Sequence, residues 1–131
     1  MKKSILMKKE IIYTENAPKP GNYSQAIKCG NLIFVSGQTA DDISTGKPIY
    51  GSIAEQTEHI LNNIKSILEA AGSEMNKALK CTVFLSSLEH KREFEEVYKR
   101  FFAENPPARI TVAAKEIDAE LDVEIDVIAA V

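Results

Sequence analysis

The stretch from Ile53 to Ala71 constrains the fold more than any other part of the chain, because its apolar residues recur at helical spacing. They fall on one side of a helix, and their polar neighbours fill the opposite side. Ser52 precedes the first apolar residue and Glu55 follows three positions later, as in a capping box. Gly72 follows the last apolar residue, as a helix-ending glycine does. The sequence therefore predicts an amphipathic helix here, which needs an apolar surface to pack on.

Strand-like segments lie on both sides of this helix. Apolar runs and alternation predict strands at 10–14, 23–28, 32–36, 79–85, 109–114 and 121–129. Cys29-Gly30-Asn31 between the second and third of them favours a β-hairpin, and residues 94–102 have the spacing of a second helix, which ends before Pro106. This order predicts an α+β domain with a mixed β-sheet and both helices packed on one of its faces.

The predicted sheet leaves its second face to be covered. The last strand alternates between an apolar set, expected on the helices, and a mainly acidic set, expected to meet water or another subunit. The two sets are Leu121, Val123, Ile125 and Val127, and Asp122, Glu124, Asp126 and Ile128. In strand 32–36 apolar residues point both ways, so both of its faces are expected to be buried. We therefore expect the sheet to pack against neighbouring copies of the chain.

Length and charge fit one small domain that needs no metal or disulfide to fold. The 131 residues are 44% hydrophobic, and the net charge of -3 is mixed along the chain, without the basic stripe of nucleic-acid binders. Cys29 and Cys81 lack CxxC spacing, and His59 and His90 stand alone, so no metal site is expected. Cys81 falls on the apolar side of its strand, which favours a core thiol, and both histidines are expected at the surface.

The start of the chain carries only a three-residue apolar core, residues 5–7, too short for a signal peptide. No apolar run reaches the length of a membrane span. We expect a cytoplasmic protein with reduced cysteines and without a membrane partner. Residues 1–9 are expected to be an N-terminal extension and residues 10–131 a single domain.

Arg109 is the first candidate for binding chemistry. It begins an apolar strand directly after Pro106-Pro107-Ala108, so the prolines fix where the strand starts. Its guanidinium matches a carboxylate bidentately and stays charged at any relevant pH. Composition alone slightly favours the alternative, a strand-edge arginine paired with a surface carboxylate.

Glu124 is the second candidate, because it lies mid-strand on one side with Asp122 and Asp126. Mutual repulsion among three carboxylates raises the pKa of at least one, which could then accept a proton near neutral pH. A solvated acidic face is an equally good interpretation. Tyr23 and Ser36-Gly37 form a third group that could bring donors to a ligand, although Tyr23 also suits a core or interface aromatic.

These segments together resemble the RidA (YjgF/YER057c) family. The resemblance runs in register from about residue 10 to residue 130, and the ordered set is specific although each piece is weak. The matching segments are residues 16–18, 21–27, 30–38, 70–72, 80–85, 97–102, 107–109 and 123–125, with Gln56 and Asn63. It implies a chorismate-mutase-like fold and a homotrimer with ligand clefts between subunits. It also implies a cofactor-independent deaminase that hydrolyses 2-iminobutanoate and 2-iminopropanoate, products of pyridoxal-phosphate enzymes, to 2-keto acids and ammonia.

Carried over by position, Arg109 matches the family's essential arginine, and Tyr23, Ser36, Gly37 and Glu124 match other cleft residues. Two positions depart from the family pattern. Thr111 replaces a frequent cysteine, and its hydroxyl can still hydrogen-bond a ligand. Glu95 replaces a frequent asparagine and would disfavour an anionic substrate if it points into the cleft. Asn22 also stands where proline is usual.

The resulting hypothesis assigns the substrate carboxylate to Arg109 and the activation of water to Glu124, with Tyr23, Ser36, Gly37, Thr111 and Glu95 around the substrate. One alternative is a non-enzymatic protein that binds small carboxylates and regulates a partner. A second is translation inhibition or RNA cleavage, names that the family has also carried. The acidic balance and the lack of a catalytic histidine pair argue against the second alternative.

Overall fold

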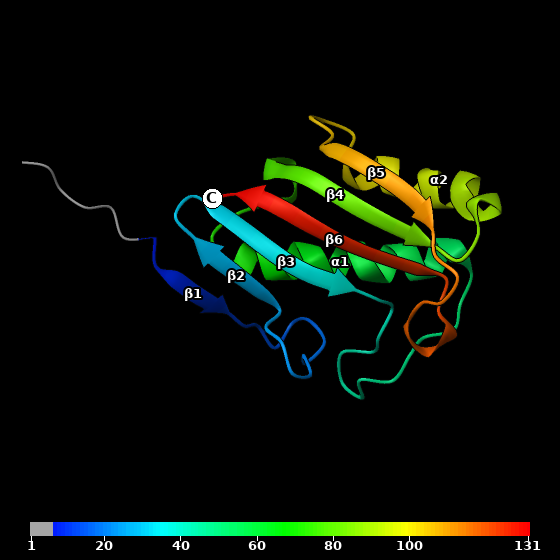
Figure 1. Ribbon diagram of the computed structural model, residues 1–131, viewed down its shortest axis with the longest axis horizontal. Coiled ribbons are helices and arrows are strands. Elements are labelled where there is room, and N and C mark those ends of the chain that lie inside the picture. Colours follow the sequence, from blue (N-terminus) through cyan, green and yellow to red (C-terminus); the bar gives the residue numbers. More distant parts are fainter. Residues whose placement is uncertain (1–6) are drawn as a thin grey trace, which may run out of the picture.

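The computed structural model describes residues 7–131, which form one mixed sheet and two helices (Figure 1). The strands are β1 (Lys9–Ile12), β2 (Ala26–Cys29), β3 (Leu32–Gln38), β4 (Ala78–Leu85), β5 (Ala108–Ala113) and β6 (Val123–Ala130). The helices are α1 (Ile53–Ala70) and α2 (Lys91–Phe101), with short 3₁₀ turns η1 (Met75–Lys77), η2 (Leu88–His90) and η3 (Asp118–Glu120). The strand order is β1-β2-β3-β6-β4-β5, in which β4 and β5 are parallel and the other neighbours antiparallel. The predicted α+β architecture is confirmed.

The core lies between the sheet and the two helices, which cover the same face (Figure 1). The apolar side of α1 is fully buried, as its periodicity predicts. It packs on alternate residues of the central strands, and the main members of this core are Ile33, Val35, Ile60, Leu61, Ile64, Ile67, Leu68, Cys81, Val83, Leu85, Phe94, Val123, Ile125 and Val127. The predicted apolar side of the last strand therefore does face the helices.

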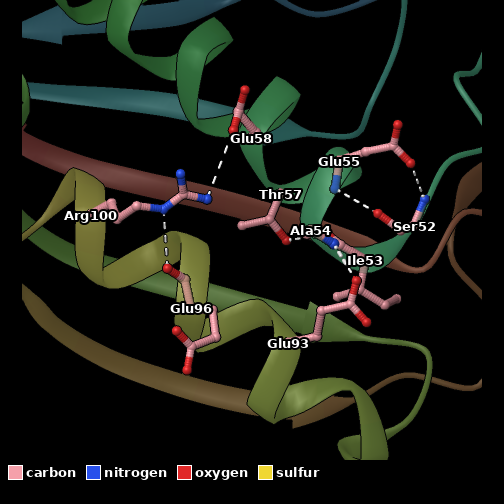
Figure 2. A network of polar contacts seen from close by, with 9 residues as sticks. All are labelled: Ser52, Ile53, Ala54, Glu55, Thr57, Glu58, Glu93, Glu96 and Arg100. Carbon is pink, nitrogen blue, oxygen red and sulfur yellow. Dashed lines mark hydrogen bonds and ion pairs between the residues drawn. The ribbon is translucent and has the colours of Figure 1, made fainter.

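The start of α1 is held both by its own cap and by α2 (Figure 2). The Ser52 hydroxyl accepts a hydrogen bond from the Glu55 amide at 3.1 Å, and the Glu55 carboxylate accepts one from the Ser52 amide at 2.8 Å. The Ala54 amide, which has no partner within the helix, donates to Glu93 of α2 at 3.0 Å. The predicted capping box is present, and α2 satisfies a further amide at the same helix end.

The strands β1 and β2 are shorter than the sequence pattern predicts, with four residues each. The side chain of Gln25, which is 1% exposed, replaces strand pairing at the end of β1. Its Oε1 accepts from the Thr14 amide at 2.7 Å, and its Nε2 donates to the carbonyls of Thr14 and Pro18, both at 3.0 Å. Lys9 already pairs with Cys29 in the ladder, whereas residues 1–6 of the predicted N-terminal extension lie outside the described residues.

The sheet face opposite the helices carries apolar side chains that a single chain leaves open. Within one chain only one face of residues 32–36 is buried, since Ile33 is buried while Phe34 is 42% exposed. The expected burial of the second face by neighbouring copies stays a prediction. The face continues across the sheet with Ile11, Ile110 and Val112, which are 67%, 51% and 37% exposed. Among residues 7–131, no helix has the length and apolar character that crossing a membrane requires.

Candidate functional site

A pocket of about 410 Å³ lies where β3 ends and β6 begins. Its lining residues are Tyr23, Ser36, Gly37, Thr39, Asp41, Asp118 and Glu124. Four of them, Tyr23, Ser36, Gly37 and Glu124, are residues that the sequence singled out. The other three are Thr39, Asp41 and Asp118. Together with Glu124, the two aspartates give the pocket three carboxylates.

Gly37 makes room for the carboxylate of Glu124. The ladder between β3 and β6 shifts register between Val35 and Gln38, so Gly37 lies in an irregular part of the strand. A Cβ atom at residue 37 would collide with Oε2 of Glu124 and would lie 3.3 Å from its Cδ. The absence of a side chain at this position therefore lets the carboxylate lie against the backbone.

Burial is the main cause that raises the pKa of Glu124 above its ordinary value. The negative charges of Asp118 and Asp126 add to this effect. The direction agrees with the sequence prediction, but Asp122 is not among the causes. Asp122 instead accepts hydrogen bonds from Gln56 at 3.1 Å and Ser86 at 2.7 Å. Glu124 thus combines partial burial with like charge, a combination often found in catalytic carboxylates.

Asp118 reaches the pocket from η3, a turn with unusual backbone geometry. Ala119 and Glu120 both adopt left-handed conformations, with φ of 56° and 59°. The hydroxyl of Tyr50 donates to the Ala119 carbonyl at 2.8 Å and ties this turn to the loop before α1. Sequence reasoning missed Asp118, because neither alanine nor glutamate favours a positive φ and so no local signal marks the turn.

Ser36 and Tyr23 form the wall beside Glu124. The Ser36 hydroxyl donates to the Ser24 carbonyl at 2.6 Å and its amide donates to the Gln25 carbonyl at 2.9 Å, so both donors are already engaged. Its hydroxyl oxygen can still accept a hydrogen bond. Tyr23 is 58% exposed, so it is not a core residue of the single chain.

Arg109 lies away from this pocket, in the outer strand β5 beside α2. Its two terminal nitrogens donate to the two carboxylate oxygens of Glu95 at 2.7 and 2.8 Å. Its guanidinium carbon lies 4.6 Å from the ring centroid of Tyr98 and 5.5 Å from that of Phe94. In the single chain Arg109 is thus a strand-edge arginine paired with a partly exposed carboxylate of the same chain, which is the alternative that composition favoured. The bidentate geometry is the one that its chemistry predicts.

This ion pair favours the charged form of both Arg109 and Glu95. The hydrogen bonds with Glu95 raise the pKa of Arg109, and the same bonds hold the pKa of Glu95 below its ordinary value. Thr111 shares the helix-facing side of β5 with Arg109, as the sequence predicts, and its buried hydroxyl oxygen has no hydrogen-bond partner within residues 7–131.

The two halves of the predicted cleft lie on opposite faces of the sheet. Arg109 pairs with Cys81 of β4, whose side chain is buried against the helices. Glu124 pairs with Phe84 of β4, three residues after Cys81. Because neighbouring strand residues point to opposite faces, Phe84 and Glu124 lie on the face away from the helices. A single chain therefore does not bring Arg109 and Glu124 to one ligand.

The remaining residues that the sequence singled out do not line the pocket. Cys81 is a core thiol, as predicted, and burial raises its pKa to about 11. His59 is exposed and His90 partly exposed. Within residues 7–131, no three His, Cys, Asp or Glu side chains cluster closely enough to hold a metal ion.

The fold and the pocket together define a class of small α+β proteins with an acidic pocket where β3 ends and β6 begins. The family model described as Endoribonuclease L-PSP matches residues 14–131. A RutC family protein of Pyrococcus horikoshii is 47% identical over 122 residues, which cover 92% of this chain and 97% of that protein. The Reactive Intermediate Deaminase A of Arabidopsis thaliana, a chloroplastic protein, is 40% identical over 121 residues, 90% of this chain and 65% of that protein.

A solved structure of a relative has the same fold. RidA from an Antarctic Psychrobacter superposes with a TM-score of 0.89 at 36% identity, covering 93% of this chain and 99% of that one. The chain therefore belongs to the RidA/YjgF/RutC family, as the resemblance predicts.

Proposed function

We propose that the protein is a cofactor-independent deaminase that hydrolyses 2-iminobutanoate and 2-iminopropanoate to 2-keto acids and ammonia. The half-buried Glu124, whose pKa is raised in a pocket with two further carboxylates, is the observation that carries this proposal. Family membership supports it, because one relative bears the name Reactive Intermediate Deaminase A. The proposed place of action is the cytoplasm, where the free thiols of Cys29 and Cys81 stay reduced.

The acidic pocket suits the reactive form of the substrate. A protonated imine carries a positive charge on nitrogen, and the carboxylates of Asp41, Asp118 and Glu124 favour that cation. Glu124 accepts a proton from water as the water oxygen bonds to the imine carbon. Glu124 then returns this proton to the amino nitrogen of the adduct. As the carbon–nitrogen bond breaks and ammonia leaves, the adduct's hydroxyl proton passes to Glu124 and the carbonyl of the 2-keto acid forms. Positioning and one acid–base group suffice, because free imines already hydrolyse in water.

Arg109 supplies the charge that the pocket lacks. The substrate's carboxylate would be repelled by the three pocket carboxylates, so it needs a cation opposite them. A guanidinium offers the matching pair of donors. Ser36, Gly37 and Thr111 border the substrate in this proposal, and Tyr23 closes the pocket.

A second copy of the chain can bring Arg109 to the pocket. We propose a homotrimer with clefts between subunits, in line with the family resemblance. The open apolar face, with Phe34, Ile110 and Val112, offers the surface for this contact, and burying it removes apolar area from water. The outer strand β5, which carries Arg109, lies at one edge of that face (Figure 1).

The decisive experiment is a coupled assay in which threonine dehydratase supplies the imine. The wild type should accelerate keto-acid formation, and Arg109→Ala should lose that acceleration by about 30-fold or more, because the substrate carboxylate loses its partner. Arg100→Ala is the matched control, since Arg100 is exposed on α2 and lies 3.9 Å from Glu58.

The alternatives make different predictions in the same assay. A pure carboxylate binder would bind 2-oxobutanoate without accelerating keto-acid formation. RNA cleavage would require the phosphate backbone to approach a pocket with three carboxylates, which charge repulsion disfavours. Full acceleration by the Arg109→Ala variant would refute the proposed role of the arginine.

A further inference from the structure

The carboxylate-binding edge of Arg109 is occupied by a residue of the same chain. Glu95 binds both terminal nitrogens at 2.7 and 2.8 Å, the geometry that an external carboxylate would need for bidentate binding. This chain therefore places a full negative charge on the group that is proposed to bind the substrate.

We infer that Glu95 is an internal competitor for the carboxylate site of Arg109, and that a small 2-oxo or 2-imino monocarboxylate must displace it to bind. The inference rests on the proposed function only for the identity of the ligand. Its structural basis is the bidentate pair itself, which leaves the end of the guanidinium without a free pair of parallel donors.

The pair is built so that Glu95 can leave while Arg109 stays. The Arg109 side chain is 19% exposed and lies against the rings of Tyr98 and Phe94, whereas the Glu95 side chain is 39% exposed. Glu95 projects from the surface of α2, where rotation about its side-chain bonds moves the carboxylate toward water. Displacement therefore breaks the ion pair, while Arg109 can keep its place against the rings of Tyr98 and Phe94.

A second cation on α2 can receive the displaced carboxylate. Lys91 lies one helical turn before Glu95, and its positive charge already helps to lower the pKa of Glu95. Glu95 thus has one ion-pair partner, Arg109, inside the site and a second positive charge nearby, outside it. A ligand selects between these two arrangements by taking the place on Arg109.

A rival arrangement leaves Glu95 in place. Arg109 has five N–H donors, and a ligand carboxylate could bind its side edge, through Nε, while Glu95 keeps the end. In that case Glu95 would orient the guanidinium, and removing its charge would weaken ligand binding or leave it unchanged. The two arrangements therefore predict opposite effects of the same substitution.

Calorimetric titration with 2-oxobutanoate tests the inference, because this probe binds without being hydrolysed. Glu95→Gln should lower the dissociation constant about three- to tenfold, since the variant no longer sets a charged carboxylate against the probe. Glu95→Ala should change it in the same direction. Glu96→Gln is the matched control with the same loss of charge, since Glu96 lies on α2 beside Arg100 (Figure 2) and pairs with Lys99 at 3.2 Å.

Each outcome decides the inference separately from the proposed function. Tighter binding by the Glu95 variants alone, abolished by adding Arg109→Ala, supports competition, even where the wild type proves to have no deaminase activity. Equal or weaker binding by both Glu95 variants overturns competition, even where the wild type is an active deaminase. Failure of all variants to bind the probe also overturns it, because the freed arginine would then not be a carboxylate site.

Discussion

At the scale of single residues, the pocket depends on where two carboxylates lie relative to each other. Glu124 is held against Gly37, and Asp118 reaches the same pocket from a turn fixed by the hydrogen bond of Tyr50. The Asp118 charge adds to burial in raising the pKa of Glu124. Asp118 is therefore expected to tune the reaction through Glu124.

Asp118→Asn should move the acidic limb of the pH–activity profile to lower pH. If ionised Glu124 is the base, activity falls as pH drops through its pKa. Removing the negative charge at residue 118 favours the ionised carboxylate, which lowers that pKa and extends activity toward acid. The profile of kcat/KM against pH measures this. Glu120→Gln, in the same turn, should leave the limb in place, and an unmoved limb in Asp118→Asn would contradict the coupling.

At the scale of elements, sequence periodicity predicted the helices and strands well and their spatial relations poorly. The capping box at Ser52 and the apolar side of α1 follow from local spacing, so both could be read directly. The faces on which Arg109 and Glu124 lie depend on how β5, β4 and β6 pair, and no local pattern specifies that register. The pairing of Arg109 with Glu95 likewise requires knowing that α2 packs behind β5.

Ser52→Ala should destabilise the protein by about 1 kcal/mol, because the Glu55 amide loses its partner at the start of α1. Urea denaturation at a fixed protein concentration measures the free energy of unfolding. Ser66→Ala, a change of the same type in the middle of α1, should alter it by less than about 0.5 kcal/mol. Equal effects of the two substitutions would mean that the cap contributes nothing beyond helix propensity.

At the scale of the whole molecule, the proposed site and the open sheet face both favour contact with a second copy of the chain. One chain carries the acidic pocket on one side of the sheet and the arginine on the other, and it exposes apolar side chains from β1 to β5. A second copy packed on this face would meet both needs. The strand patterns predicted that neighbouring copies of the chain cover this face, but no local pattern could predict the geometry of that contact.

Ile110→Lys should dissociate the proposed homotrimer and abolish deaminase activity, although neither Arg109 nor Glu124 is changed. Ile110 is 51% exposed on the open face, so a lysine there fits a monomer but would be buried unpaired in an interface. Light scattering after size-exclusion chromatography should show the mass fall from three chains to one of 14.5 kDa. Leu88→Lys, exposed in η2, should keep both assembly and activity. A trimeric and active Ile110→Lys variant would place the interface elsewhere.

The strand order also determines when this domain can fold. β6 is the last of the strands along the chain, yet it lies in the middle of the sheet, between β3 and β4 (Figure 1). Until it has been synthesised, the β1–β3 meander and the β4–β5 pair share no strand ladder and α1 lacks its central packing partner. Contacts of such large sequence separation slow folding. On the ribosome the domain therefore stays incomplete until β6 has emerged. We expect proteases to degrade a chain that is truncated before Val123.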